Sequence, residues 1–197
     1  MKIKQVRDDI KEVARKSLSK HNFVSGKDGR LFKTDENGNC FSIMFLEVKD
    51  RSSFSISVNV TASFENVDKL FPKDETDPEF TLNCRLGSES ISFDSYTKSE
   101  LEDIIDRLTS SLAIPFLSRI STEDKVMENL SSEDSTVWIT SDIVARYKFK
   151  FASAIASNDS GMLSLYLNET DKLLSKPWVG QYKTQLTKLC NYARKSM

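Results

Sequence analysis

One segment decides the fold, because its residues alternate between polar and apolar along its whole length: Ser53-Phe54-Ser55-Ile56-Ser57-Val58-Asn59-Val60-Thr61-Ala62-Ser63-Phe64. Successive side chains of a β-strand point to opposite faces, so this period of two places every apolar residue on one face of a sheet. Ser, Thr and Asn line the other face, which suits water or a polar ligand. The segment therefore predicts an antiparallel strand that is buried on one side.

Strand signals continue on both sides of this segment. Residues 31–33 and 40–48 are expected to pair through the turn at residues 35–39, where Asn37-Gly38 suits the two positive φ angles of a type I′ turn. Residues 80–86 alternate again, Gly87 is expected to end that strand, and residues 91–93 predict a short further one. Together these signals predict an antiparallel meander of about four or five strands.

Apolar residues recur at helical spacing before and after the meander. They predict an amphipathic helix over residues 3–20 that stops at Asn22, and a second helix that begins at Thr97 with a capping box to Glu100 and is broken or kinked at Pro115. A shorter helix is expected to follow a cap at residues 121–124 and to run through Leu130. Three more are expected at about 141–157 after a Thr140 cap, 160–175 and 177–195. The predicted class is α+β, with an N-terminal helix, an antiparallel meander and a C-terminal all-helical region.

The polar run at residues 131–135 is the best internal boundary of the chain. It separates an α+β domain over residues 1–130 from a helical region over residues 131–197. Two arrangements are consistent with the sequence: the helical region is a separate domain, or it packs on the first part as a single domain.

Composition indicates an ordinary globular protein, since 39% of the 197 residues are hydrophobic and 29% are charged. The three cysteines are few and widely spaced, which is typical of reduced thiols. Charged residues interrupt the N-terminus where a secretory signal needs an apolar run, and no stretch approaches the roughly 18 apolar residues of a membrane span. The sequence therefore predicts a cytoplasmic protein with no membrane partner.

The net charge of −1 conceals an acidic centre between basic ends. Residues 65–135 carry seven Lys or Arg and seventeen Asp or Glu, a net of −10, whereas the segments before and after them carry +4 and +5. These parts either attract one another within the fold or present an acidic surface to a basic protein partner. On the second interpretation, the binding candidates in the acidic loop are Asp74, Glu75, Asp77 and Glu79.

Motifs for catalysis are sparse. The single histidine, His21, follows the polar end of the first predicted helix, and the chain has neither a Gly-x-Ser-x-Gly elbow nor a complete phosphate-binding loop. We predict no metal and no cofactor, because one histidine and three scattered cysteines do not give a zinc-site spacing. Whether the chain is an enzyme stays open. The enzymatic alternative is a hydrolase or transferase that uses the carboxylates of residues 74–79 or 100–106 across a cleft.

A second set of binding candidates lies where basic and aromatic residues interleave, in the segment Arg146-Tyr147-Lys148-Phe149-Lys150-Phe151. As a strand, this segment would present an aromatic platform to single-stranded nucleic acid. As a helix, which its spacing favours, it places the aromatic rings in the core and turns the cations outward. Arg146, Lys148 and Lys150 are thus candidates for a nucleic-acid alternative.

Several short stretches, taken in their order, resemble the bacterial family called domain of unknown function 4304. They are residues 18–23, residues 30–33, the strand from Phe54 to Val60, residues 84–87 and residues 115–117. The resemblance covers roughly residues 3–130 and implies an N-terminal helix, a curved antiparallel sheet and following helices. It supplies no catalytic residues, and small domains of this kind suggest immunity proteins that accompany bacterial toxins.

The functional hypothesis from the sequence is a non-enzymatic protein–protein binding module, with immunity or antitoxin proteins as the suggested type. Its partner would be a basic protein that meets the acidic centre of the chain. Carboxylate-dependent catalysis and binding of single-stranded nucleic acid are the alternatives.

Overall fold

The structure is a computed structural model that describes residues 3–26, 29–71, 81–132, 139–140 and 142–196. The described chain falls into two compact units. Residues up to Ser63 and residues Leu82–Ser118 form the first unit, and residues Phe64–Thr81 and Arg119 onward form the second. The boundary expected near residue 130 falls within the second unit, which also takes in a segment from the middle of the sequence.

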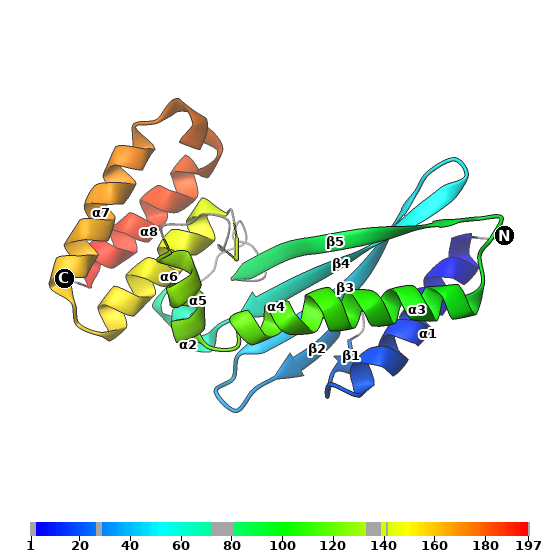
Figure 1. Cartoon of the computed structure of the whole chain (residues 1–197). Helices are drawn as coiled ribbons and strands as arrows, with labels where there is room; N and C mark the ends of the chain where they lie inside the picture. Colours follow the sequence, from blue (N-terminus) through cyan, green and yellow to red (C-terminus); the bar gives the residue numbers. More distant parts are fainter. Residues whose placement is uncertain (1–2, 27–28, 72–80, 133–138, 141, 197) are drawn as a thin grey trace. The chain divides into compact units, whose positions relative to one another are not determined.

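The first unit is built on a five-stranded antiparallel sheet, as far as the described residues show (Figure 1). Its strands follow one another in sequence order: β1 (Val24–Ser25), β2 (Leu31–Thr34), β3 (Cys40–Lys49), β4 (Ser53–Ser63) and β5 (Leu82–Ser92). The predicted meander is therefore confirmed. β4 carries the alternating segment, and its apolar residues are at most 1% exposed: Phe54, Ile56, Val58, Val60, Ala62 and the following Phe64.

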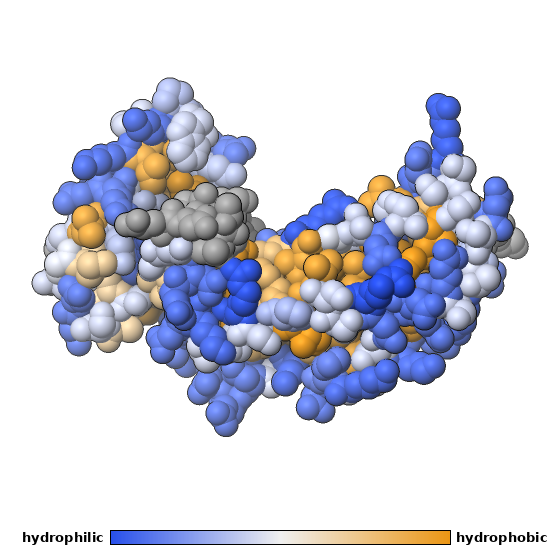
Figure 2. Space-filling view, viewed as in Figure 1, coloured by the Kyte–Doolittle hydropathy of each residue, from blue (hydrophilic) through white to orange (hydrophobic). Residues whose placement is uncertain are grey.

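Two helices lie side by side on one face of this sheet (Figure 1). α1 (Ile3–Ser19) is the predicted N-terminal helix, and Asn22 ends its last turn in the left-handed conformation with φ of 64°. α3 (Lys98–Leu108) begins at the predicted Thr97 cap, whose side chain accepts the N–H of Glu100. Figure 2 shows that the outer surface of this helical layer is mainly hydrophilic.

The loop between β2 and β3 differs from the predicted type I′ turn. Gly38 adopts a positive φ of 82°, whereas Asn37 is not among the described residues with positive φ. Gly38 N donates to Asp35 O, and Asp35 N donates to Asn39 O across the end of the loop. The loop thus resembles a type I turn followed by a glycine in the left-handed conformation. This arrangement fits the twist of the two strands and needs only one residue at positive φ.

Gly87 does not end its strand, contrary to the expectation from the sequence. β5 continues through Gly87 to Ser92. Its pairing with β4 shifts register between Val58 and Asn59, and Leu86 is the extra residue of the resulting β-bulge. A Cβ added to Gly87 would stand 2.9 Å from Leu112 Cδ1. The glycine thus allows the helical layer to approach the sheet closely.

Pro115 does not break the helical path that follows α3. The chain passes through a π-helical turn, η1 (Thr109–Ala113), into α4 (Ile114–Arg119). Ile114 N donates to Thr109 O, five residues back. Proline has no N–H to donate, and the wider π register changes the hydrogen bonding immediately before it.

The second unit is helical in its described residues. It contains α2 (Glu65–Leu70), α5 (Glu123–Leu130), α6 (Ile143–Ala156), α7 (Ser160–Leu174), the 3₁₀ helix η3 (Pro177–Tyr182) and α8 (Lys183–Lys195). α6 is central, since it packs against α2, α5, α7 and α8. Phe64 and Phe149 meet edge to face with ring centroids 5.1 Å apart. The C-terminal helices are as predicted, except that the last begins as a 3₁₀ helix and that the cap of α6 is Asp142 in place of Thr140.

Candidate binding sites

The basic–aromatic segment lies in α6, so the helical interpretation is confirmed. Its three aromatic side chains are buried: Tyr147 is 7% exposed, Phe149 1% and Phe151 0%. A base stacks on an exposed ring, and these rings instead contribute to the core of the second unit. The segment therefore offers no aromatic platform.

The cations of this segment form contacts within the second unit. Lys148 Nζ lies 2.8 Å from Asp68 Oδ1 of α2, and Lys150 Nζ lies 3.1 Å from Glu169 Oε2 of α7. Glu169 also accepts a hydrogen bond from the Tyr147 hydroxyl. Burial lowers the pKa of the Arg146 guanidinium, since a charged form loses hydration there. The binding role of Arg146, Lys148 and Lys150 stays a prediction.

The acidic loop candidates Asp74, Glu75, Asp77 and Glu79 lie outside the described residues. Other carboxylates of the acidic centre are described, and several of them are engaged in ion pairs. Glu65 pairs with Lys69, Glu89 with Arg107, and Glu102 with Lys16. These pairs are local to each unit, so part of the acidic charge is balanced within the fold.

One pocket of the second unit combines an apolar floor with carboxylates of this acidic centre. We call it the α5–α6 pocket. It has a volume of about 280 Å³ and is lined by Val67, Glu123, Asp124, Met127, Phe149, Ala152, Ser153, Ala156 and Ser157. Val67 and Phe149 are each 1% exposed and supply the apolar floor.

The local sequence explains how this pocket arises. Small residues recur on one side of α6 and its end, at positions 152, 153, 156 and 157, and leave space beside it. Thr122 caps α5 by accepting the N–H of Lys125, and this places Glu123 and Asp124 in the first turn of that helix. The Ser157 hydroxyl donates back to Ser153 O. Among the residues that line the pocket, Glu123 and Asp124 are the charged ones.

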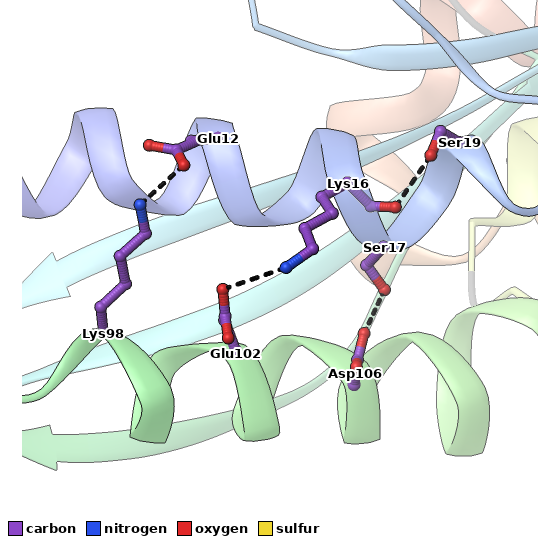
Figure 3. A network of polar contacts seen from close by, with 7 residues as sticks. All are labelled: Glu12, Lys16, Ser17, Ser19, Lys98, Glu102 and Asp106. Atoms are coloured by element: carbon purple, nitrogen blue, oxygen red, sulfur yellow. Dashed lines mark hydrogen bonds and ion pairs between the residues drawn. The ribbon is translucent and has the colours of Figure 1, made fainter.

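The carboxylates expected at residues 100–106 lie on α3, where Glu102 and Asp106 contact α1. Figure 3 shows three contacts between the helices. Lys98 Nζ lies 2.6 Å from Glu12 Oε1, Lys16 Nζ lies 3.6 Å from Glu102 Oε1, and the Ser17 hydroxyl donates to Asp106 at 2.5 Å. The Lys98 contact lowers the pKa of Glu12 and raises that of Lys98, because each charge stabilises the other.

Beyond the Ser17 to Asp106 contact lies a second hollow, which we call the α1–α3 pocket. Its volume is about 450 Å³, and its lining is polar throughout: Ser17, Lys20, His21, Asp103, Asp106, Arg107, Thr109 and Ser110. Asp103 and Asp106 thus share one hollow with the only histidine of the chain, whereas Glu100 and Glu102 do not line it. The carboxylate-dependent alternative keeps these two residues as candidates.

Sequence reasoning missed both pockets. It identified Glu123 and Asp124 only as part of a helix cap, and it placed His21 at the polar end of the first helix without assigning it to a site. The small residues at helical spacing in α6 were a usable signal for a close approach of another element. By contrast, Val67 reaches the α5–α6 pocket only through the tertiary fold, and the sequence around it gives no sign of this.

Among the described residues, no cluster of three or more His, Cys, Asp or Glu side chains is arranged to hold a metal ion. No described helix combines the length and the apolar character that crossing a membrane requires.

Comparison with known proteins gives no family for this chain. No family model, no curated protein and no solved structure matches it.

Proposed function

We propose that the chain is a non-enzymatic protein-binding module, of immunity or antitoxin type, and that its partner presents a basic segment. The observation that carries this proposal is the α5–α6 pocket, in which an apolar floor meets the carboxylates of Glu123 and Asp124. The resemblance to domain of unknown function 4304 supports the immunity-type part of the proposal.

The chemistry of the pocket favours a Lys or Arg side chain. Such a side chain has an aliphatic stem that packs on apolar surface and a cationic head that needs a polar or anionic partner. Phe149, Val67 and Ala152 would contact the stem, and the two carboxylates would contact the head. A volume of about 280 Å³ lies just below the usual range of small-molecule sites, which suits one side chain of a protein.

The charge of the surrounding sequence supports the same partner. Asp124 is exposed and forms no ion pair with another described residue, and Glu128 of the same helix is also exposed. Both belong to the segment of net charge −10. Complementary charge accelerates encounter with a basic protein and disfavours acidic ones.

A peptide titration tests the chemistry of the pocket. The probe is the acetylated and amidated pentapeptide Ala-Ala-Arg-Ala-Ala, with Glu or norleucine at its centre as controls, and binding to the full chain is followed by NMR. We expect millimolar binding of the Arg peptide, with shifts at Met127 and Ser153, and at least fivefold weaker binding of both controls. Equal shifts from all three peptides would contradict the proposal.

Variants distinguish an Arg side chain that binds in the α5–α6 pocket from a peptide that is attracted only by the charge of the surface. Asp124→Asn should weaken binding of the Arg peptide about two- to fivefold, as expected for an exposed ion pair. Ser153→Phe fills the pocket from an exposed position without changing the charge and should abolish binding. Glu128→Gln removes one exposed charge of α5 outside the pocket and serves as the matched control, which should stay within twofold of the parent chain.

The biological partner is tested with the same variants. A protein captured from the native host should be retained by the parent chain and by Glu128→Gln, and lost with Ser153→Phe. Capture that is unaffected by Ser153→Phe would show that the partner binds elsewhere, and the α5–α6 pocket would then be abandoned as the binding site.

A further inference from the structure

The central strand of the sheet, β3, is apolar on both of its faces. Ile43 and Phe45 lie on the face that the helices cover, opposite apolar residues of β4. The alternate residues Met44, Leu46 and Val48 lie on the opposite face. An antiparallel strand that faces water on one side normally alternates apolar with polar residues. The pattern of β3 is therefore typical of a strand that is covered on both faces.

The described helices of the first unit cover only one of these faces (Figure 1). Arg7 of α1 pairs with Glu47 of β3, and Arg107 of α3 pairs with Glu89 of β5. Both carboxylates lie beside Ile56 in the register of the sheet, so they share its face. None of the described helices of this unit lies over the other side of the sheet, which we call the open face.

The open face is almost free of charge. In the register of β2–β5, Arg85 is the only charged residue on it, although 29% of the chain is charged. Val48 is 54% exposed on this face, and Met44 and Leu46 are partly exposed. Depletion of charge around apolar side chains distinguishes the core of a protein interface from the rest of a surface.

Polar side chains of the open face form hydrogen bonds with one another across the strands. The hydroxyl oxygens of Ser42 and Thr61 lie 2.6 Å apart, and those of Ser55 and Ser90 lie 2.9 Å apart. Because these hydroxyls have partners within the sheet, another surface can cover them without leaving them unsatisfied. The open face can therefore lose its water with little loss of hydrogen bonding.

We propose that the open face binds the open face of a second copy of this chain, as two sheets packed face to face. A two-fold axis that crosses the strands at Leu46 places this residue against its own copy and Met44 against Val48 of the second copy. An isologous contact sets one surface patch against itself, which brings like charges together unless the patch is neutral. The open face meets this condition, since Arg85 lies at its rim on the edge strand β5.

The size of the open face is sufficient for a weak dimer. β3 has 10 residues, and β4 and β5 have 11 each. Three strands of about ten residues, at about 3.3 Å per residue and about 4.8 Å between strands, cover roughly 500 Å². Two copies then bury about 1,000 Å² in total, which is the lower limit for a specific interface. We therefore expect a dissociation constant in the micromolar range.

Sedimentation velocity of the full chain between about 1 and about 500 µM tests the dimer. We expect monomer at the lowest concentration and mostly dimer at the highest. A chain that stays monomeric over this range would overturn the proposal and leave the open face to water or to a different protein.

A matched pair of variants tests which surface forms the dimer. Val48→Lys places a charge in the apolar row at an exposed position and should weaken the dimer by about tenfold or more, because the charge loses its hydration. Leu165→Lys is the control, since Leu165 is 48% exposed on α7 of the second unit, and it should change the affinity by about twofold or less. Circular dichroism verifies that both variants fold. Equal dissociation constants for the parent chain and Val48→Lys would overturn the proposal.

A compensating substitution tests the two-fold arrangement. Met44→Glu alone should also weaken the dimer by about tenfold or more. When it is combined with Val48→Lys in one chain, the new charges meet with opposite signs across the axis, and the affinity should rise again above that of either single variant. The two positions lie about 13 Å apart along one strand, so they do not pair within a copy. A double variant that binds no better than the weaker single variant would overturn the proposed arrangement.

Discussion

Lys148 and Asp68 form a largely buried ion pair that joins α6 to α2 within the second unit. Lys148 Nζ lies 2.8 Å from Asp68 Oδ1, and the two side chains are only 11% and 21% exposed. Asp68 also accepts a hydrogen bond of 2.8 Å from the Thr81 hydroxyl. The carboxylate thus connects the two ends of the segment over residues 64–81 that belongs to this unit, and the lysine ties that segment to the central helix.

Substitution of Lys148 by Met should destabilise the second unit by about 1–3 kcal/mol. The substitution removes the cationic partner of the partly buried Asp68 carboxylate, and a buried charge that loses its counter-charge is costly. Lys69→Met removes an exposed i, i+4 pair with Glu65 of the same helix and should change stability by about 0.5 kcal/mol or less. The check is urea unfolding followed by tryptophan fluorescence and circular dichroism. Equal effects of the two substitutions would contradict the structural role of the pair.

The same ion pair shows what the sequence could predict and what it could not. The spacing of Ile143, Tyr147, Phe151 and Ile155 is helical, and it predicted that the aromatic rings of this segment face the core. Which carboxylate meets Lys148 depends on α2, and no periodic signal marked this six-residue helix between the alternating strand and the acidic loop. Short elements are held mainly by tertiary contacts, which leave little trace in the local pattern.

Alkaline pH should destabilise the second unit through Cys190. This thiol is fully buried, and burial raises its pKa because the thiolate would lose hydration. The folded state therefore keeps its proton at pH values where the unfolded state, with a pKa near 8.5, has released it. The free energy of unfolding should fall as pH rises above about 8.5. Burial also raises the pKa of Tyr147, which extends the loss to pH values above about 10.

Two cysteine variants check this pH dependence. In Cys190→Ala, the fall in unfolding free energy between about pH 8 and about pH 10 should be smaller than in the parent chain, whatever the variant costs near neutral pH. Cys40→Ala is the control, since Cys40 is partly exposed and lies in the first unit. Parallel pH profiles for the parent chain and Cys190→Ala would show that the thiol does not contribute.

The turn between β2 and β3 should depend on Asp35 and Gly38 more than on Asn37. Asp35 Oδ1 accepts the N–H groups of Asn37 and Asn39, each at 2.9 Å. Asp35→Ala removes this acceptor from both N–H groups and should cost about 1–2 kcal/mol. Gly38→Ala should cost about 1 kcal/mol, because an L-residue is strained at a φ of 82°. In a type I′ turn Asn37 would also adopt a positive φ, and Asn37→Ala would cost about as much as Gly38→Ala. In the observed turn, Asn37→Ala should change the free energy of unfolding by less than about 0.5 kcal/mol, measured by thermal unfolding.

The turn and the bulge mark the limits of prediction from the first unit's sequence. Glycine and asparagine correctly located the connection, and alternation correctly located β4. Both glycine assignments failed in detail, because several backbone conformations accept glycine equally well. At Gly38 the deciding factor was the Asp35 side chain, and at Gly87 it was the approach of Leu112.

Gly87→Ala should destabilise the first unit by about 1 kcal/mol, and the cause should be Leu112 alone. The added Cβ would stand 2.9 Å from Leu112 Cδ1, and no positive φ strains an alanine at this position. In a Leu112→Ala background the clash is absent, so the same substitution should become neutral or stabilise by about 0.5 kcal/mol through the lower entropy of the unfolded chain. A double-mutant cycle on urea unfolding measures this change of sign. If Gly87→Ala costs the same in both backgrounds, the close contact between β5 and the π turn is not what requires glycine there.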